Sequence, residues 1–247
     1  MNQVSVRFLG SGDAFGSGGR FQACIFVRAP STRFLIDCGA SSLIAMRRFN
    51  VDPSDVDLIL VSHLHGDHFG GLPFFVLDAQ LVSRRAKPLT VAGPPGIADR
   101  VRQAMEVLFP GSSQVERRFS LNFVELEDGV ETTVDSVSVT PQAVVHASGA
   151  PAYAYRVVCD GKVLAYSGDT EWTDALVRVA DGADMFACEA YFFDKKVKFH
   201  LDYETLAQHR EDLGCRRIVL THMSADMLSR LGSLDLETAE DGMLIEI

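Results

Sequence analysis

The side chains with the clearest chemical potential lie in one short segment, His63-Leu64-His65-Gly66-Asp67-His68. Four of these six residues can bind a metal ion. Neutral imidazole and carboxylate are the usual ligands of catalytic zinc, and a compact turn allows neighbouring side chains to serve two adjacent ions. A polar surface turn is the alternative, but a row of uncompensated ligand-type groups directly after the apolar run Leu58–Val61 serves no packing purpose. The segment therefore indicates a metal centre.

Four further ligand-type residues each follow an apolar run of strand length: His146, Asp169, Glu189 and His222. If these runs are core strands, their carboxyl ends bring the four side chains and His63 to one edge of the fold, where α/β proteins commonly bind ligands. The sequence therefore predicts that the groups converge on a site large enough for two metal ions.

The elements that must position these residues are short strands interleaved with fewer helices. Strands are predicted at Val4–Leu9, Cys24–Val27, Phe34–Ile36, Leu58–Val61, Leu89–Ala92, Val137–Val139, Ala154–Val158, Val163–Tyr166 and Ile218–Leu220. Helices are predicted at Ser42–Phe49, Ile97–Phe109, Asp174–Ala180 and Tyr203–Leu213, the last with Asp202 as its N-cap. Asp128-Gly129 and Asp160-Gly161 are typical of hairpin turns, which favours a mixed α/β sandwich over a purely parallel sheet.

Length and composition are consistent with one domain spanning residues 1–247, since no linker or repeat divides the chain. The net charge of −10 gives nucleic acid no general attraction. The five cysteines are odd in number and have no CxxC spacing, which indicates a reducing compartment. No signal peptide and no apolar run long enough to cross a membrane is present, so we expect a cytoplasmic protein.

At this point the sequence resembles the metallo-β-lactamase superfamily. The resemblance is carried by Phe8-Leu9-Gly10-Ser11-Gly12, the segment from His63 to His68, His146, Ser167-Gly168-Asp169-Thr170 and Leu220-Thr221-His222. It implies a four-layer αββα sandwich of two mixed β-sheets with two divalent metal ions. Carried over by motif, the ligands of the first ion would be His63, His65 and His146, those of the second Asp67, His68 and His222, and Asp169 would bridge them. Zinc is favoured, and Mn²⁺ and Fe²⁺ stay open because the same ligands suit them.

Departures from particular branches narrow the function. True β-lactamases commonly use a cysteine where this chain has Asp169, which disfavours antibiotic hydrolysis. Flavodiiron proteins carry a glutamate where it has His65, which disfavours redox chemistry. Ribonuclease Z and the cyclic phosphoribose phosphodiesterases resemble it more, because both share an additional histidine, matched by His200, and an acidic residue, matched by Glu189. Ribonuclease Z normally inserts a tRNA-clamping arm between the segments of His146 and Asp169, and here only 22 residues separate them, enough for a hairpin. A small phosphodiester is therefore favoured over a large RNA.

These features predict a binuclear metal-dependent hydrolase in which a metal-bridging hydroxide attacks phosphorus. His200 would stabilise the developing charge or protonate the leaving oxygen, Glu189 would orient His200, and Asp67 would accept a proton besides binding metal. Two alternatives stay open: ribonuclease Z-type tRNA 3′ processing, and a non-catalytic module that binds a metal or ligand. A homodimer is what related proteins suggest. His209, inside a predicted helix, is expected to be solvated and not a ligand.

Overall fold

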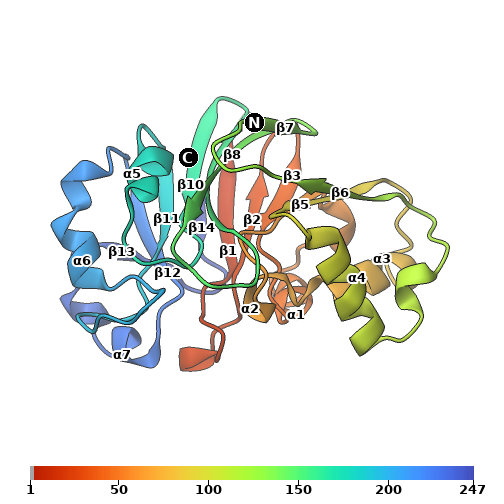
Figure 1. Cartoon of the computed structure of the whole chain (residues 1–247), viewed down its shortest axis with the longest axis horizontal. Coiled ribbons are helices and arrows are strands. Elements are labelled where there is room, and N and C mark those ends of the chain that lie inside the picture. The colour runs from red at the N-terminus through yellow and green to blue at the C-terminus, as the bar shows by residue number, and fades with distance from the viewer. Residues whose placement is uncertain (1–2) are drawn as a thin grey trace.

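The computed structural model describes residues 3–247 and contains two β-sheets packed face to face, with helices on both outer sides (Figure 1). Each sheet has seven strands. In Figure 1 α3 and α4 lie at the right of the molecule, α1 and α2 lie below β1 and β2, and α5–α7 lie at the left. The predicted four-layer αββα sandwich of the metallo-β-lactamase fold is therefore confirmed.

The first sheet comes almost entirely from the N-terminal half of the chain. Its strands, in spatial order, are β14 (Leu244–Glu246), β1 (Ser5–Gly10), β2 (Cys24–Arg28), β3 (Arg33–Ile36), β4 (Leu58–Leu60), β5 (Leu89–Gly93) and β6 (Leu121–Glu125). The pairs from β14 to β3 are antiparallel and those from β3 to β6 are parallel. β4 is buried on both faces, as its unbroken apolar sequence predicts for an inner parallel strand.

The second sheet comes from the C-terminal half. Its strands, in spatial order, are β13 (Glu237–Thr238), β12 (Ile218–Thr221), β11 (Met185–Glu189), β10 (Lys162–Tyr166), β9 (Ala152–Cys159), β8 (Val137–Val144) and β7 (Thr132–Val134). The strands from β10 to β13 are parallel, and those from β7 to β10 are antiparallel. β8 therefore runs in the same direction as β10, β11 and β12, so the carboxyl ends of these four strands lie at one edge.

Helices cover the outer face of each sheet. Those on the first sheet are α1 (Ser42–Arg48), α2 (Gly66–Phe69), α3 (Leu72–Leu81) and α4 (Ile97–Leu108); those on the second are α5 (Asp174–Ala180), α6 (Tyr203–Gln208) and α7 (Ala225–Leu228). Short 3-10 turns are η1 (Ser17–Gly19), η2 (Pro53–Asp55), η3 (Ser112–Gln114), η4 (Arg210–Asp212) and η5 (Leu231–Ser233). One apolar core fills the space between the sheets, and two more lie under the outer helices.

Local sequence explains why the helices form. In α4 the buried residues are Ile97, Val101 and Met105, one helical turn apart, while the intervening residues face outward. Asp202 caps α6 as predicted, because its Oδ1 accepts a hydrogen bond from the backbone N–H of Thr205 at 2.9 Å. Among the described residues no helix is long and apolar enough to cross a membrane.

Two local predictions are wrong. The helix expected over Tyr203–Leu213 ends at Gln208 and continues only as the 3-10 turn η4, whose acidic residues oppose the negative end of a helix. Asp128-Gly129 is not a hairpin turn: it lies between β6 and β7, which belong to different sheets, so it carries the chain across the sandwich. Asp160-Gly161 does join the antiparallel strands β9 and β10 in a hairpin.

Candidate metal centre

The segment from His63 to His68 forms one tight turn beyond β4. β4 ends at Leu60, and the chain then enters the short helix α2, whose first turn holds Asp67 and His68. The carbonyl of His65, just before α2, accepts a hydrogen bond from the N–H of His68 at 3.0 Å. The turn therefore presents four ligand-type side chains from one short stretch of backbone.

The other ligand-type residues follow the ends of β8, β10, β11 and β12, as predicted. His146 follows β8, and Asp169 follows β10. Gly168, just before Asp169, has a φ of 58°, which suits glycine. It also has no room for a side chain, because a Cβ would lie 2.8 Å from the Tyr153 carbonyl. Glu189 is the last residue of β11, and His222 comes directly after β12. His222 has φ 57°, an uncommon conformation for a residue other than glycine and one often found at functional sites.

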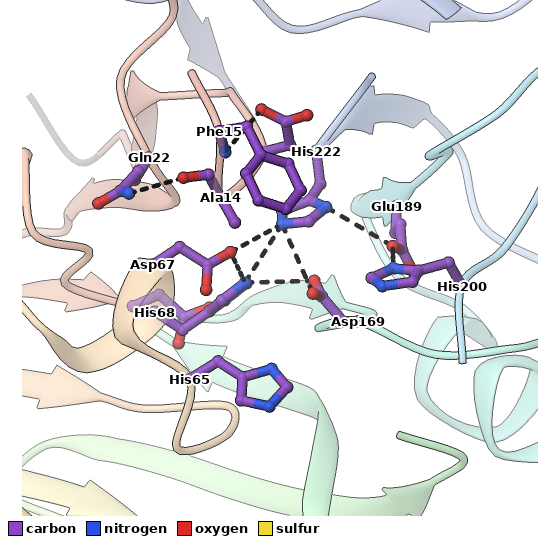
Figure 2. Close-up of polar contacts among 12 residues, drawn as sticks. Ala14, Phe15, Gln22, His65, Asp67, His68, Asp169, Glu189, His200 and His222 are labelled. Carbon is purple, nitrogen blue, oxygen red and sulfur yellow. Dashed lines mark hydrogen bonds and ion pairs between the residues drawn. The ribbon is translucent and has the colours of Figure 1, made fainter. Parts of the chain in front are cut away.

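The structure brings all seven predicted metal ligands together in two sets. His63, His65 and His146 form one, and Asp67, His68, Asp169 and His222 form the other; within each, one potential ligand atom per residue lies within 4.8 Å of the others. In the second set, Nε2 of His222 lies 3.2 Å from Oδ2 of Asp67 (Figure 2). In the first, Nε2 of His146 lies 3.0 Å from Nδ1 of His65.

Asp169 lies between the two sets. Its Oδ2 is 3.5 Å from Nε2 of His222, 3.8 Å from Nε2 of His63 and 4.0 Å from Nε2 of His146. Asp169 is buried. One carboxylate is therefore within reach of both sets, which is the position that a bridging ligand requires.

Hydrogen bonds behind the centre fix three of the imidazole rings through Nδ1. Nδ1 of His146 donates to the carbonyl of Phe199 at 2.9 Å, and Nδ1 of His68 lies 2.7 Å from the carboxylate of Asp37. Nδ1 of His63 lies 3.1 Å from the hydroxyl of Ser62. Because a carbonyl and a carboxylate only accept, His146 and His68 carry a proton on Nδ1. In a neutral ring this leaves Nε2 free to bind metal.

Some ligand atoms in the interior of the centre are buried without a hydrogen-bond partner. Among the predicted ligands, His63 Nε2 and Asp169 Oδ1 are buried and make no hydrogen bond within the described residues, whereas Nδ1 of His222, also without one, faces Oε1 of Glu189 at 3.6 Å. Buried polar atoms without a partner are uncommon and need an explanation. Divalent cations fit these donors because imidazole nitrogen and carboxylate oxygen are their preferred ligands.

The pKa shifts indicate that the centre calls for positive charge. Burial alone would disfavour charge on His222, but Asp169, Asp67 and Glu189 outweigh it and raise the pKa of His222 to about 10. For His63, burial together with the neighbouring His68 holds the pKa well below its ordinary value. His63 is therefore neutral, which is the form of imidazole that binds a metal ion, and metal binding at His222 would release the proton that its raised pKa retains.

Glu189, which is buried, and His200, which is half-buried, form a pair beside the two sets (Figure 2). Oε1 of Glu189 accepts a hydrogen bond from Nδ1 of His200. Oε2 of Glu189 accepts from the backbone N–H groups of Thr170 at 2.8 Å and Leu201 at 3.3 Å, so this carboxylate is fixed in place. Burial opposes protonation of His200, but the hydrogen bond with Glu189 outweighs it and raises the pKa of His200 above its ordinary value. The ring also stacks on Tyr191, with centroids 4.6 Å apart.

Sequence reasoning missed Asp37, which is fully buried behind His68. Its carboxylate also accepts hydrogen bonds from the hydroxyls of Ser62 at 2.9 Å and Tyr166 at 2.8 Å. The signal was present, because Asp37 directly follows the apolar run Phe34–Ile36, as Asp169 follows its own. His209 lies outside both ligand sets; its ring stacks on Trp172 at 4.1 Å, with the side chain 38% exposed.

The fold and the grouped histidines and carboxylates define a metal-dependent hydrolase of the metallo-β-lactamase superfamily. Within it, the chain belongs to the family described as "Anti-Pycsar protein Apyc1", whose model matches residues 4–238.

Comparisons with individual proteins agree with this class. The chain is 26% identical to ribonuclease Z of Geobacillus kaustophilus, over 90% of this chain and 89% of that protein. Its fold is similar to that of YhfI from Bacillus subtilis, a metallo-β-lactamase fold protein, with a TM-score of 0.80, 16% identity, and coverage of 99% of this chain and 100% of that one. It is also similar to a diphosphatase of the PhnP family, with a TM-score of 0.76, 18% identity, and coverage of 99% and 98%.

Proposed function

We propose that this protein hydrolyses small phosphodiesters with two divalent metal ions, zinc by preference. The observation that carries the proposal is the convergence of seven ligand-type side chains in two sets that share Asp169. His63, His65 and His146 would hold one ion, and Asp67, His68 and His222 the other, with Asp169 between them. When bound, such ions activate water as a nucleophile and stabilise negative charge on phosphoryl oxygens.

The chain itself supplies a proton for the leaving group. Hydrolysis adds water across one P–O ester bond and yields a phosphate monoester and an alcohol, so the departing oxygen must gain a proton. Nδ1 of His200 is held by Glu189, which leaves Nε2 as the donor atom. The raised pKa of His200 keeps this proton available near neutral pH. We therefore assign His200 as the general acid and Glu189 as the residue that positions it.

Asp67 is assigned mainly as a ligand. Burial would raise its pKa, but His68 and the hydrogen bond from His222 lower it well below its ordinary range. A carboxylate of low pKa is a good ligand and a weak base. Asp67 would therefore accept a proton from the attacking water only transiently and would not retain it.

A small substrate is favoured because only the β9–β10 hairpin separates β8 from the segment of Asp169. The acidic chain, with a net charge of −10, also offers a polyanion no general attraction. Ribonuclease Z-type processing is the second candidate, favoured by the similarity to ribonuclease Z across most of the chain.

The test combines metal analysis with turnover of three substrates: a chromogenic phosphodiester, a nucleoside cyclic phosphate and a precursor tRNA. We expect two equivalents of bound metal and turnover of the small esters. Turnover of the tRNA alone would favour the second candidate, and bound metal with no turnover would favour a binding module.

The proposed role of His200 is tested with a matched pair of variants. His200→Ala should lower kcat by about 10²- to 10⁴-fold without loss of metal. His209→Ala removes a histidine outside the centre and should leave kcat unchanged. Full turnover by His200→Ala with both metals bound would show that this role is wrong.

A further inference from the structure

Phe15 is an exposed aromatic residue in a loop that contacts the segment of His222. Its side chain is 84% exposed, the largest value for a large apolar residue in the described part of the chain. It belongs to the loop between β1 and η1. An apolar ring held in water contributes nothing to folding by burial, so Phe15 is not part of the core and its ring is free to contact a ligand.

The loop that carries Phe15 is held rigidly. At its tip the buried carboxylate of Asp13 accepts hydrogen bonds from the N–H of Phe15 at 3.2 Å and from the N–H and hydroxyl of Ser17 at 2.9 and 2.7 Å. At its base Asp241 accepts from the N–H groups of Ser11 at 2.9 Å and Phe21 at 2.7 Å. The backbone is therefore fixed and holds Phe15 in its exposed position, which lowers the entropic cost of using the ring for binding.

The same loop lies against the segment of His222. The carbonyl of Ser11 accepts a hydrogen bond from the N–H of His222 at 3.1 Å, and Gly12 pairs with Met223. Figure 2 shows the ring of Phe15 on the His222 side of the centre, away from His65. Tyr191, half-buried and stacked on His200, provides a second aromatic ring close to the centre.

We propose that Phe15 is a substrate-positioning residue whose ring stacks on a planar ring in the organic part of the phosphodiester. This inference rests on the proposed function. Metal ions would bind the phosphoryl group, which every phosphodiester has, so they cannot distinguish phosphodiesters by their organic substituents. A fixed, exposed aromatic face beside them can, because stacking on a flat ring requires neither charge nor a particular hydrogen-bond pattern.

The test compares two substrates with the same scissile bond: a nucleoside cyclic phosphate and its abasic analogue, in which hydrogen replaces the base. Phe15→Ala, in the metal-loaded enzyme, should lower kcat/KM for the base-bearing ester about tenfold, mainly through KM. The abasic ester should change less than twofold. Phe15→Trp should retain the preference for the base. Val107→Ala, which truncates a side chain 81% exposed on α4, is the matched control and should change neither value.

Several outcomes overturn the inference, and they differ from failure of the proposed function. Equal losses on both esters, or no preference of the wild type for the base, would show that Phe15 does not contact the ring. A smaller particle for Phe15→Ala in size-exclusion chromatography would assign the ring to a contact between copies of the chain. If the wild type hydrolysed neither ester, the proposed function and this inference would both be wrong.

Discussion

Replacing Glu189 by glutamine tests whether the acid His200 depends on one buried carboxylate. Glutamine keeps the size of the side chain, and its single oxygen can still accept from Thr170 and Leu201, where Oε2 now lies. The amide NH₂ then faces Nδ1 of His200, so the bond between imidazole and carboxylate is lost. Hydrogen bonds to charged groups contribute about 1.5–3 kcal/mol. If this contribution is lost from the transition state, kcat falls about 10- to 100-fold.

The assay is a double-mutant cycle with steady-state kinetics and metal analysis of each variant. Glu189→Gln should cost about 10- to 100-fold in the wild type but less than threefold in the His200→Ala background, where no imidazole remains to position. Glu237→Gln, on β13, serves as the control for loss of an acidic side chain. Equal costs in both backgrounds would refute the reasoning, because Glu189 would then act by another route, such as His222, whose Nδ1 lies 3.6 Å from Oε1.

Further predictions concern the ions, the residue behind them and the thiols. Removing metal with a chelator should lower Tm reversibly by about 5–10 °C for each ion lost, if the free metal concentration is 100 times the Kd of each site. An unchanged Tm in calorimetry would argue against a resident metal. Asp37→Asn should weaken metal affinity about 10- to 100-fold in chelator competition, because Asp37 orients His68; unchanged affinity would make Asp37 a purely structural residue. Burial raises the pKa of Cys24 and of Cys159 to about 12. Between about pH 9 and pH 12 these thiols therefore ionise in the unfolded chain but not in the folded chain. The free energy of unfolding is unaffected by them below pH 9 and decreases as the pH rises to 12, by up to ~4 kcal/mol for Cys24. Tm measured against pH should fall less steeply for Cys24→Ala, and an identical slope would contradict this.

The sequence predicted the centre better than it predicted the connections. Ligand positions could be predicted because a polar residue directly after a buried strand is a local pattern, and the edge where such strands end is set by the fold class. Asp37 obeys the same pattern and could have been included. Phe199 could not, because it acts through its backbone carbonyl, which any residue would supply.

The missed elements have a different cause. α3 is apolar nearly all round, so its sequence Leu72–Leu81 lacks the helical period that reveals an amphipathic helix. Asp128-Gly129 has the composition of a hairpin turn, but composition does not specify which sheet the next strand joins. In the structure β6 pairs with β5 in the first sheet, whereas β7 pairs with β8 in the second, so the segment around Asp128 connects the two sheets.

The proposed ligands are divided between the two sheets: four follow β4 in the first, and three follow strands of the second. A nascent chain of which only the N-terminal half has been synthesised would hold only four of the seven ligands. A chain in which the two sheets packed in the wrong position would also fail to bring all seven together. Tight uptake of both cations would then report correct assembly of the whole sandwich. Both ions would then bind only late in folding, and misassembled copies of the chain would lack activity.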